Sequence, residues 1–69
     1  MAEYKAIIKR DGEWFIGWIE EIPGVNSQGK TREELLDNLR SALTEALEFN
    51  RADAKSAASG EFEEATITA

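Results

Sequence analysis

A chain of 69 residues without cysteine or histidine forms one small domain that neither disulfides nor zinc sites of the usual kind can stabilise. Fourteen acidic against eight basic side chains give a net charge of −6, which argues against binding nucleic acid over a wide surface. A domain of this size is marginal as a monomer, so we expect a homo-oligomer.

The first part of the chain predicts a β-hairpin. Residues 4–10 alternate in the manner of a half-buried strand. Asp11-Gly12 predicts a type I′ turn, because glycine and aspartate tolerate the positive φ that this turn requires. Residues 13–19 are rich in aromatic and β-branched side chains and form the returning strand.

The second strand is apolar on both faces. Alternate residues divide it into two sets, Phe15, Gly17 and Ile19, and Trp14, Ile16 and Trp18. Because a residue without a side chain lets a helix approach closely, we place the set containing Gly17 under the helix. The other set would lie exposed with Ile7, and an exposed apolar patch usually marks an interaction surface. We therefore predict an oligomer interface, rather than a ligand groove, made of Ile7, Trp14, Ile16 and Trp18.

A short strand and a capped helix follow. Pro23-Gly24 and Gly29-Lys30 predict turns that leave room for one strand at residues 25–28. Thr31-Arg32-Glu33-Glu34 is a capping box, which predicts a helix from Arg32 to about Asn50. Its apolar stripe favours a helix packed on a sheet over a coiled coil, since the repeat is short; the stripe contains Leu35, Leu36, Leu39, Ala42, Leu43, Ala46 and Leu47.

The end of the chain predicts a loop and a fourth strand. Residues 51–60 lack apolar periodicity; they could prolong the helix by a turn, but Ser56-Ala57-Ala58-Ser59-Gly60 is typical of a loop. Residues 62–69 are typical of an edge strand. A right-handed crossover after the helix would place this strand parallel to the first. The expected fold is α+β, with the order β-β-β-α-β and a four-stranded mixed sheet of order 3-2-1-4 carrying one helix. Residues 1–69 would form a single domain without a separate DNA-binding domain.

Four consecutive pieces of the first 50 residues resemble the HicB-like antitoxins of bacterial toxin–antitoxin pairs. The pieces are Phe15-Ile16-Gly17-Trp18-Ile19, Glu21-Ile22-Pro23-Gly24-Val25, Gln28-Gly29-Lys30-Thr31 and Glu33-Glu34-Leu35-Leu36. The resemblance implies a partial ribonuclease-H-like fold and an oligomer that covers the active surface of a small RNA-cleaving, HicA-like toxin. Many members carry a second, DNA-binding domain, and nothing in this sequence has that pattern.

The sequence does not favour an enzyme. Ribonuclease-H catalysis needs a carboxylate at the centre of the first strand, and residues 4–10 contain none. Without histidine or cysteine there is no familiar pairing of nucleophile and base, and the glycines stand singly at turns rather than in a phosphate-binding loop. We therefore expect no catalytic residue, no cofactor and no metal.

The expected function is that of an antitoxin-type protein that masks a basic RNA-cleaving toxin. Glu20 and Glu21 are candidate partner-facing acids, although the same pair fits the solvated mouth of a turn. The alternative is a stand-alone oligomeric scaffold or regulator without a toxin. The start of the chain lacks a signal-peptide pattern and no apolar stretch approaches membrane-spanning length, so we expect a cytoplasmic protein that binds neither membranes nor nucleic acid directly.

Overall fold

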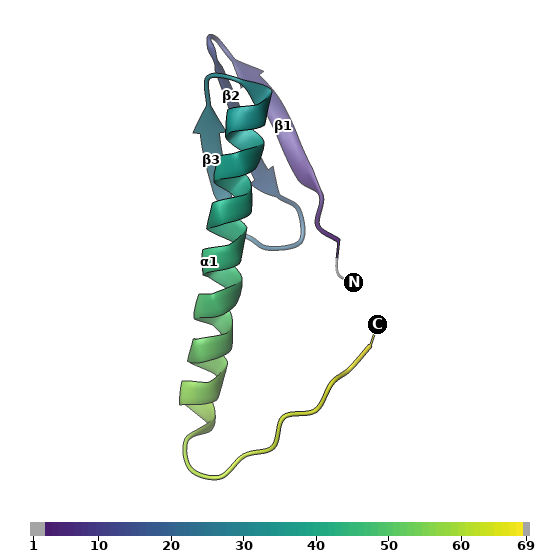
Figure 1. Cartoon of the computed structure of the whole chain (residues 1–69), viewed down its shortest axis with the longest axis vertical. Helices are drawn as coiled ribbons and strands as arrows, with labels where there is room; N and C mark the ends of the chain where they lie inside the picture. Colours follow the sequence, from purple (N-terminus) through teal and green to yellow (C-terminus); the bar gives the residue numbers. More distant parts are fainter. Residues whose placement is uncertain (1–2, 69) are drawn as a thin grey trace.

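The computed structural model describes residues 3–68 as a three-stranded antiparallel sheet with one long helix packed across one face (Figure 1). The elements are β1 (Ala6–Asp11), β2 (Trp14–Ile19), β3 (Asn26–Gly29) and α1 (Arg32–Ala58). Strand β2 lies between β1 and β3. The first three strands and the helix therefore occur in the order that the sequence predicts.

The hairpin between β1 and β2 is confirmed, but its turn lies one residue further along the chain than expected. Asp11 pairs with Trp14, so the two loop residues are Gly12 and Glu13. Gly12 has a φ of 62°, and Glu13 is not among the residues with positive φ. Positive φ at the first central position alone corresponds to a type II′ turn, which also suits the twist of a hairpin.

Strand β3 begins at Asn26 rather than at Val25, and the loop before it returns to the end of β2. The Ile19 amide donates to the Val25 carbonyl at 3.0 Å. Val25 is therefore held beside Ile19, and its side chain is buried in the core. In this way the Pro23-Gly24 turn adds an apolar residue to the core as well as reversing the chain.

Helix α1 begins as the sequence predicts. The Glu34 amide donates to the Thr31 hydroxyl at 3.1 Å, and Thr31 has the extended backbone of an N-cap residue. A hydrogen bond from the Asn38 side chain to the Gln28 carbonyl, 2.9 Å long, ties the second turn of the helix to β3. Cap and tie together fix the helix on the sheet.

The predicted helix end near Asn50 is wrong. Helix α1 continues to Ala58 and has 27 residues, so most of the predicted loop at residues 51–60 is helical. The reason is propensity, because alanine, arginine and lysine dominate this stretch and favour the helix without any apolar stripe. At 1.5 Å per residue the helix is about 40 Å long, whereas a six-residue strand spans about 20 Å.

The core lies between the first half of α1 and the sheet. Its buried side chains are Ile19, Val25, Leu35 and Leu39. A Cβ atom placed on Gly17 would lie 3.2 Å from a Leu35 methyl carbon and 3.4 Å from a Leu39 methyl carbon. The helix is therefore close to β2 because Gly17 has no side chain, and Phe15 packs against the same core. The predicted placement of Phe15, Gly17 and Ile19 under the helix is confirmed.

The predicted fourth strand is wrong, and with it the four-stranded mixed sheet of order 3-2-1-4. Residues 62–68 form no strand and are exposed, while Ala69 lies outside the described residues. Two physical reasons account for this. The longer helix carries the chain away from the sheet, and this segment has two glutamates but few large apolar side chains to bury. The described residues therefore have the order β-β-β-α, and the β-β-β-α-β order expected from the resemblance is not observed.

Candidate protein-interaction surface

The face of the sheet opposite α1 carries an exposed aromatic cluster. Residues directly opposite each other in an antiparallel pair share a face, and Ile7 pairs with Trp18 while Lys9 pairs with Ile16. Alternation then separates these positions from Gly17 and Ile19, which face the helix. We call the cluster the open face and define it by Ile7, Trp14, Ile16 and Trp18.

The open face is neither core nor fully solvated. Trp14 and Trp18 are 39% and 40% exposed, and Ile7 and Ile16 are half-buried. None of the four belongs to the core cluster beneath α1. Two large aromatic side chains side by side with two isoleucines form a hydrophobic patch of the kind that serves as a protein contact.

Charged side chains of both signs surround this patch. The Lys30 ammonium lies 5.8 Å from the centre of the Trp14 ring, within cation–π range. Lys5 and Lys9 stand two residues before and after Ile7, so strand alternation places them on the same face. Two acidic residues share that face, Asp11 opposite Trp14 and Glu20 opposite Lys5, where the Glu20 amide donates to the Lys5 carbonyl. The open face therefore combines indole rings with both lysines and carboxylates.

The two candidate acids next to the sheet differ in their surroundings. The Glu21 carboxylate accepts a hydrogen bond from the Lys5 amide at 2.9 Å, and the Glu20 amide donates to the Lys5 carbonyl at 2.9 Å. Glu21 thus fastens the loop after β2 to the start of β1, while the Glu20 side chain is exposed. The pair lies at the end of the hairpin remote from Trp14.

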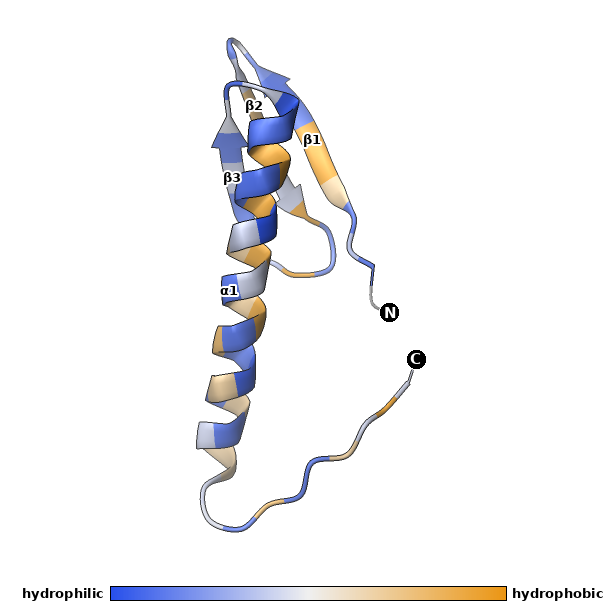
Figure 2. Ribbon diagram, viewed as in Figure 1, coloured by the Kyte–Doolittle hydropathy of each residue, from blue (hydrophilic) through white to orange (hydrophobic). Residues whose placement is uncertain are grey.

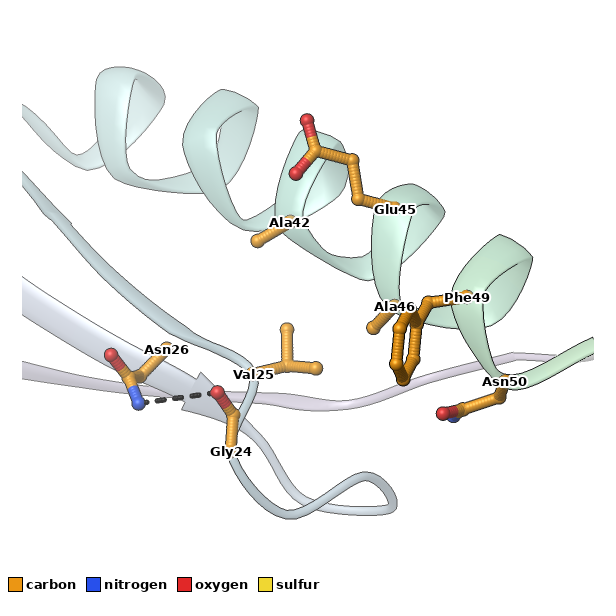
Figure 3. Close-up of a pocket in the computed structure, with 8 residues that line it drawn as sticks. All are labelled: Gly24, Val25, Asn26, Ala42, Glu45, Ala46, Phe49 and Asn50. Atoms are coloured by element: carbon orange, nitrogen blue, oxygen red, sulfur yellow. Dashed lines mark hydrogen bonds between the residues drawn. The ribbon is translucent and has the colours of Figure 1, made fainter. Parts of the chain in front are cut away.

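Sequence reasoning missed a shallow groove on the other side of the molecule. It has a volume of about 480 Å³ and lies between the Gly24–Asn26 segment and the middle of α1 (Figure 3). Phe49 lies at its edge and is 70% exposed. The spacing of the apolar residues does point to Phe49, because it continues the core-facing positions of the helix. Those positions are Leu35, Leu39, Ala42 and Ala46. The predicted helix ends one residue later, at Asn50, so the sequence did not indicate that Phe49 borders a groove.

The second half of α1 has no sheet beneath it. Apolar positions recur along the helix beyond the level at which the strands end (Figure 2).

Among residues 3–68, no group of three acidic side chains is gathered so as to hold a metal ion. In the same part of the chain, no helix combines the length and hydropathy needed to cross a membrane.

This fold and surface define a small α+β protein with an exposed aromatic sheet face. Residues 1–52 match the family model described as UPF0150-like, and the chain therefore belongs to the UPF0150-like family. The match covers β1, β2, β3 and most of α1, which includes the residues that resemble the HicB-like pattern. No curated protein and no solved structure matches the chain significantly.

Proposed function

We propose that this chain is an antitoxin-type binding protein of the HicB-like kind that masks a small, basic, RNA-cleaving toxin, which is HicA-like by the same resemblance. The observation that carries the proposal is the distribution of charge. From Arg32 to the end, the chain has nine acidic against four basic side chains, a net charge of −5 out of the total of −6. All nine acidic side chains are exposed on α1 and the segment after it.

A protein that cleaves RNA needs a basic surface to hold the phosphates. The acidic side chains of α1 and of the segment after it are together complementary to such a surface in charge, and charge complementarity speeds association and excludes wrong partners. The UPF0150-like match supports the proposal because it spans the residues of the HicB-like pattern. Binding and masking require no catalytic group from this chain, and a cytoplasmic location would give it access to an RNA-cleaving partner.

Self-association belongs to the same proposal. The four buried apolar side chains of the described residues form a small core, and a second copy on the open face would bury further apolar surface. The open face is apolar at its centre whereas α1 exposes mainly charged side chains, so the two surfaces suit different partners. The open face would form the oligomer, and α1 would remain available to the toxin.

The test is a titration of this protein against a small basic ribonuclease encoded beside it, with RNA cleavage as the readout. The native chain is expected to abolish cleavage at a fixed molar ratio. The double variant Glu48→Lys and Asp53→Lys is expected to inhibit less, because it replaces negative with positive charge on α1. The matched control, Glu3→Lys and Glu13→Lys, makes the same change in net charge away from α1 and is expected to inhibit as the native chain does. Undiminished cleavage in the presence of the native chain contradicts the proposal.

A second candidate function is a stand-alone oligomeric scaffold or regulator without a toxin. The exposed tryptophans of the open face favour self-association whether or not a toxin exists. A short neighbouring reading frame that is basic and contains histidine supports the antitoxin, and its absence together with a stable oligomer supports the scaffold.

A further inference from the structure

Strand β1 forms a free edge of the sheet. In the part of the chain that the structure describes, it pairs with β2 alone. The Glu20 amide donates to the Lys5 carbonyl, so the pairs of this hairpin that share hydrogen bonds recur at every second residue from Lys5. The amides and carbonyls of Ala6, Ile8 and Arg10 therefore point away from β2. Backbone groups along such an edge are a template for a further strand.

The opposite edge of the sheet is closed by the helix. By the same alternation Ile16 exchanges its backbone hydrogen bonds with β1, so Gln28, across from it on β3, directs its carbonyl outward. The Asn38 side chain of α1 donates to that carbonyl at 2.9 Å. Helix α1 packs over β2 and β3, whereas β1 lies beyond its cover (Figure 1). The sheet therefore accepts a further strand more readily beside β1 than beside β3.

Apolar side chains at the free edge are incompletely covered on both faces of the sheet. Ala6, Ile7 and Ile8 are half-buried. Ile7 belongs to the open face, whereas Ala6 and Ile8 pack against the rim of the core on the helix side. A strand laid along β1 would remove apolar surface from water on both faces at once. The partner that fits is a strand with apolar residues on both faces, and β1 of a second copy is such a strand.

A second copy of β1 fits in an antiparallel register centred on Ile8. A two-fold axis at this residue places Ile8 opposite its counterpart, and the outward backbone groups of the two strands then exchange hydrogen bonds. Lys5 lies three residues before Ile8 and Asp11 three residues after it, so the Lys5 of each copy stands opposite the Asp11 of the other. Lys5 then lies between two carboxylates, Glu20 of its own chain and Asp11 of the second copy. Opposite charges in directly opposed positions stabilise a strand pair.

The neighbouring symmetric registers bring like charges together. An axis at Ile7 sets Lys5 opposite Lys9 and Glu3 opposite Asp11. An axis at Lys9 sets the two Lys9 side chains opposite each other. Like charges directly opposite each other destabilise a strand pair. Larger shifts leave part of β1 without a partner strand.

The register centred on Ile8 has no such conflict within the strand. Lys9 and Arg10 both stand opposite apolar residues of the second copy. Glu3 stands opposite Glu13, but the first precedes β1 and the second lies in the hairpin loop. The positions of the charges therefore select this register from its neighbours.

We propose that two copies of this chain pair antiparallel along β1, about a two-fold axis at Ile8, and join their three-stranded sheets into one continuous sheet. The contact goes beyond the self-association in the proposed function, because it uses the edge of the sheet and leaves the open face and α1 uncovered. Neither contact requires the other, and neither requires a toxin.

The first experiment measures amide hydrogen exchange of the full native chain by NMR at several concentrations, with the mass from sedimentation equilibrium. The amides of Ala6, Ile8 and Arg10 are expected to exchange about tenfold more slowly where about nine-tenths of the chain is dimeric, because exchange then proceeds through the monomer that remains. The amides of Ile7 and Lys9 bond to β2 in either state and serve as internal controls.

The second experiment tests the register by charge reversal. Lys5→Glu and Asp11→Lys are each expected to raise the dissociation constant on the order of tenfold, because both cross-strand charge pairs become repulsive. Mixing the two variants is expected to restore association, since Glu at position 5 then meets Lys at position 11 and the native pair re-forms beside it. The matched controls, Lys55→Glu and Asp53→Lys, make the same charge changes on α1 and are expected to keep the native dissociation constant.

The backbone contact has its own variant. Arg10→Pro removes an outward amide without touching the bonds to β2 and is expected to weaken association, whereas Arg10→Ala keeps that amide and serves as its control. A native chain that stays monomeric at high concentration contradicts both this inference and the proposed self-association. Association that leaves the amides of Ala6, Ile8 and Arg10 unprotected overturns the inference alone, as does protection that is already complete in the monomer, which would assign the edge to a segment of the same chain. RNA cleavage, measured separately, reports on the toxin alone.

Discussion

Replacement of Gly29 by alanine tests how closely the helix must approach the sheet. A Cβ atom at this position would lie 2.6 Å from the Leu35 amide nitrogen and 3.0 Å from the carbonyl carbon and the Cβ of Glu34. Two of these three atoms are backbone atoms of the first turn of α1, so no side-chain rotation relieves the clash. Reaching an ordinary contact of 3.4 Å requires a shift of roughly 0.8 Å between β3 and the helix.

That shift would move Leu35, which is fully buried, and would disturb the packing of Leu39 beside it. Inserting a methyl group into a close-packed contact costs about 1–3 kcal/mol. The lower entropy of the unfolded chain returns about 0.4–1 kcal/mol when glycine becomes alanine. The expected net loss is about 1–2 kcal/mol in the free energy of unfolding, which for a domain of this size lowers the Tm by roughly 5–15 °C.

The measurement is thermal unfolding followed by circular dichroism at 222 nm, with all variants at one protein concentration because association would raise the Tm. The control is Thr66→Ala, an exposed position after the helix. The control is expected to unfold with the native chain. A Gly29→Ala protein with the native Tm would show that the helix can sit further from β3 at no cost, and the argument from close approach would fail.

Three further predictions concern the cap, the core and the open face. Thr31→Ala removes the hydroxyl that accepts from the Glu34 amide and is expected to lower the free energy of unfolding by about 1 kcal/mol in urea denaturation. Thr31→Ser keeps the hydroxyl and is expected to keep the native stability. Equal denaturation midpoints for the alanine and serine variants would contradict the capping role. Leu39→Ala is expected to lose about 2–5 kcal/mol because the side chain is buried, and Leu47→Ala, outside the core cluster, is expected to lose clearly less in the same assay. Trp18→Glu is expected to dissociate the oligomer without unfolding the chain, and an unchanged mass by light scattering argues against the open face as the interface.

The sequence predicts well where one local signal and one packing demand agree. Gly17 indicates which face of β2 lies beneath the helix, because a residue without a side chain lets a helix pack closely on a strand. Methyl groups of Leu35 and Leu39 do lie directly over Gly17. Thr31 marked the first turn of α1 because its hydroxyl bond depends on residues three positions apart. The exposure of Trp14 and Trp18 away from the core follows from the same alternation.

The sequence predicts poorly where no packing demand operates. Residues 51–58 bury nothing, so only backbone propensity keeps them helical, and their lack of apolar periodicity predicts a loop. The prediction of a fourth strand depends on the composition of residues 62–69 and on the rule for crossover connections. That rule applies only when the helix returns the chain to the sheet, and α1 ends far beyond it (Figure 1). The groove beside Phe49 was missed because the predicted helix ends at Asn50, one residue beyond Phe49.

The length of α1 also divides its backbone into two regimes. The turns that contain Leu35 and Leu39 are protected by tertiary packing, whereas the last two turns depend on their own hydrogen bonds, which are marginal for short helical stretches in water. Hydrogen–deuterium exchange along this one helix should therefore be slow at its amino-terminal end and fast at its carboxy-terminal end. Slow exchange in the last turns would reveal a neighbouring molecule lying against them, whichever molecule it is.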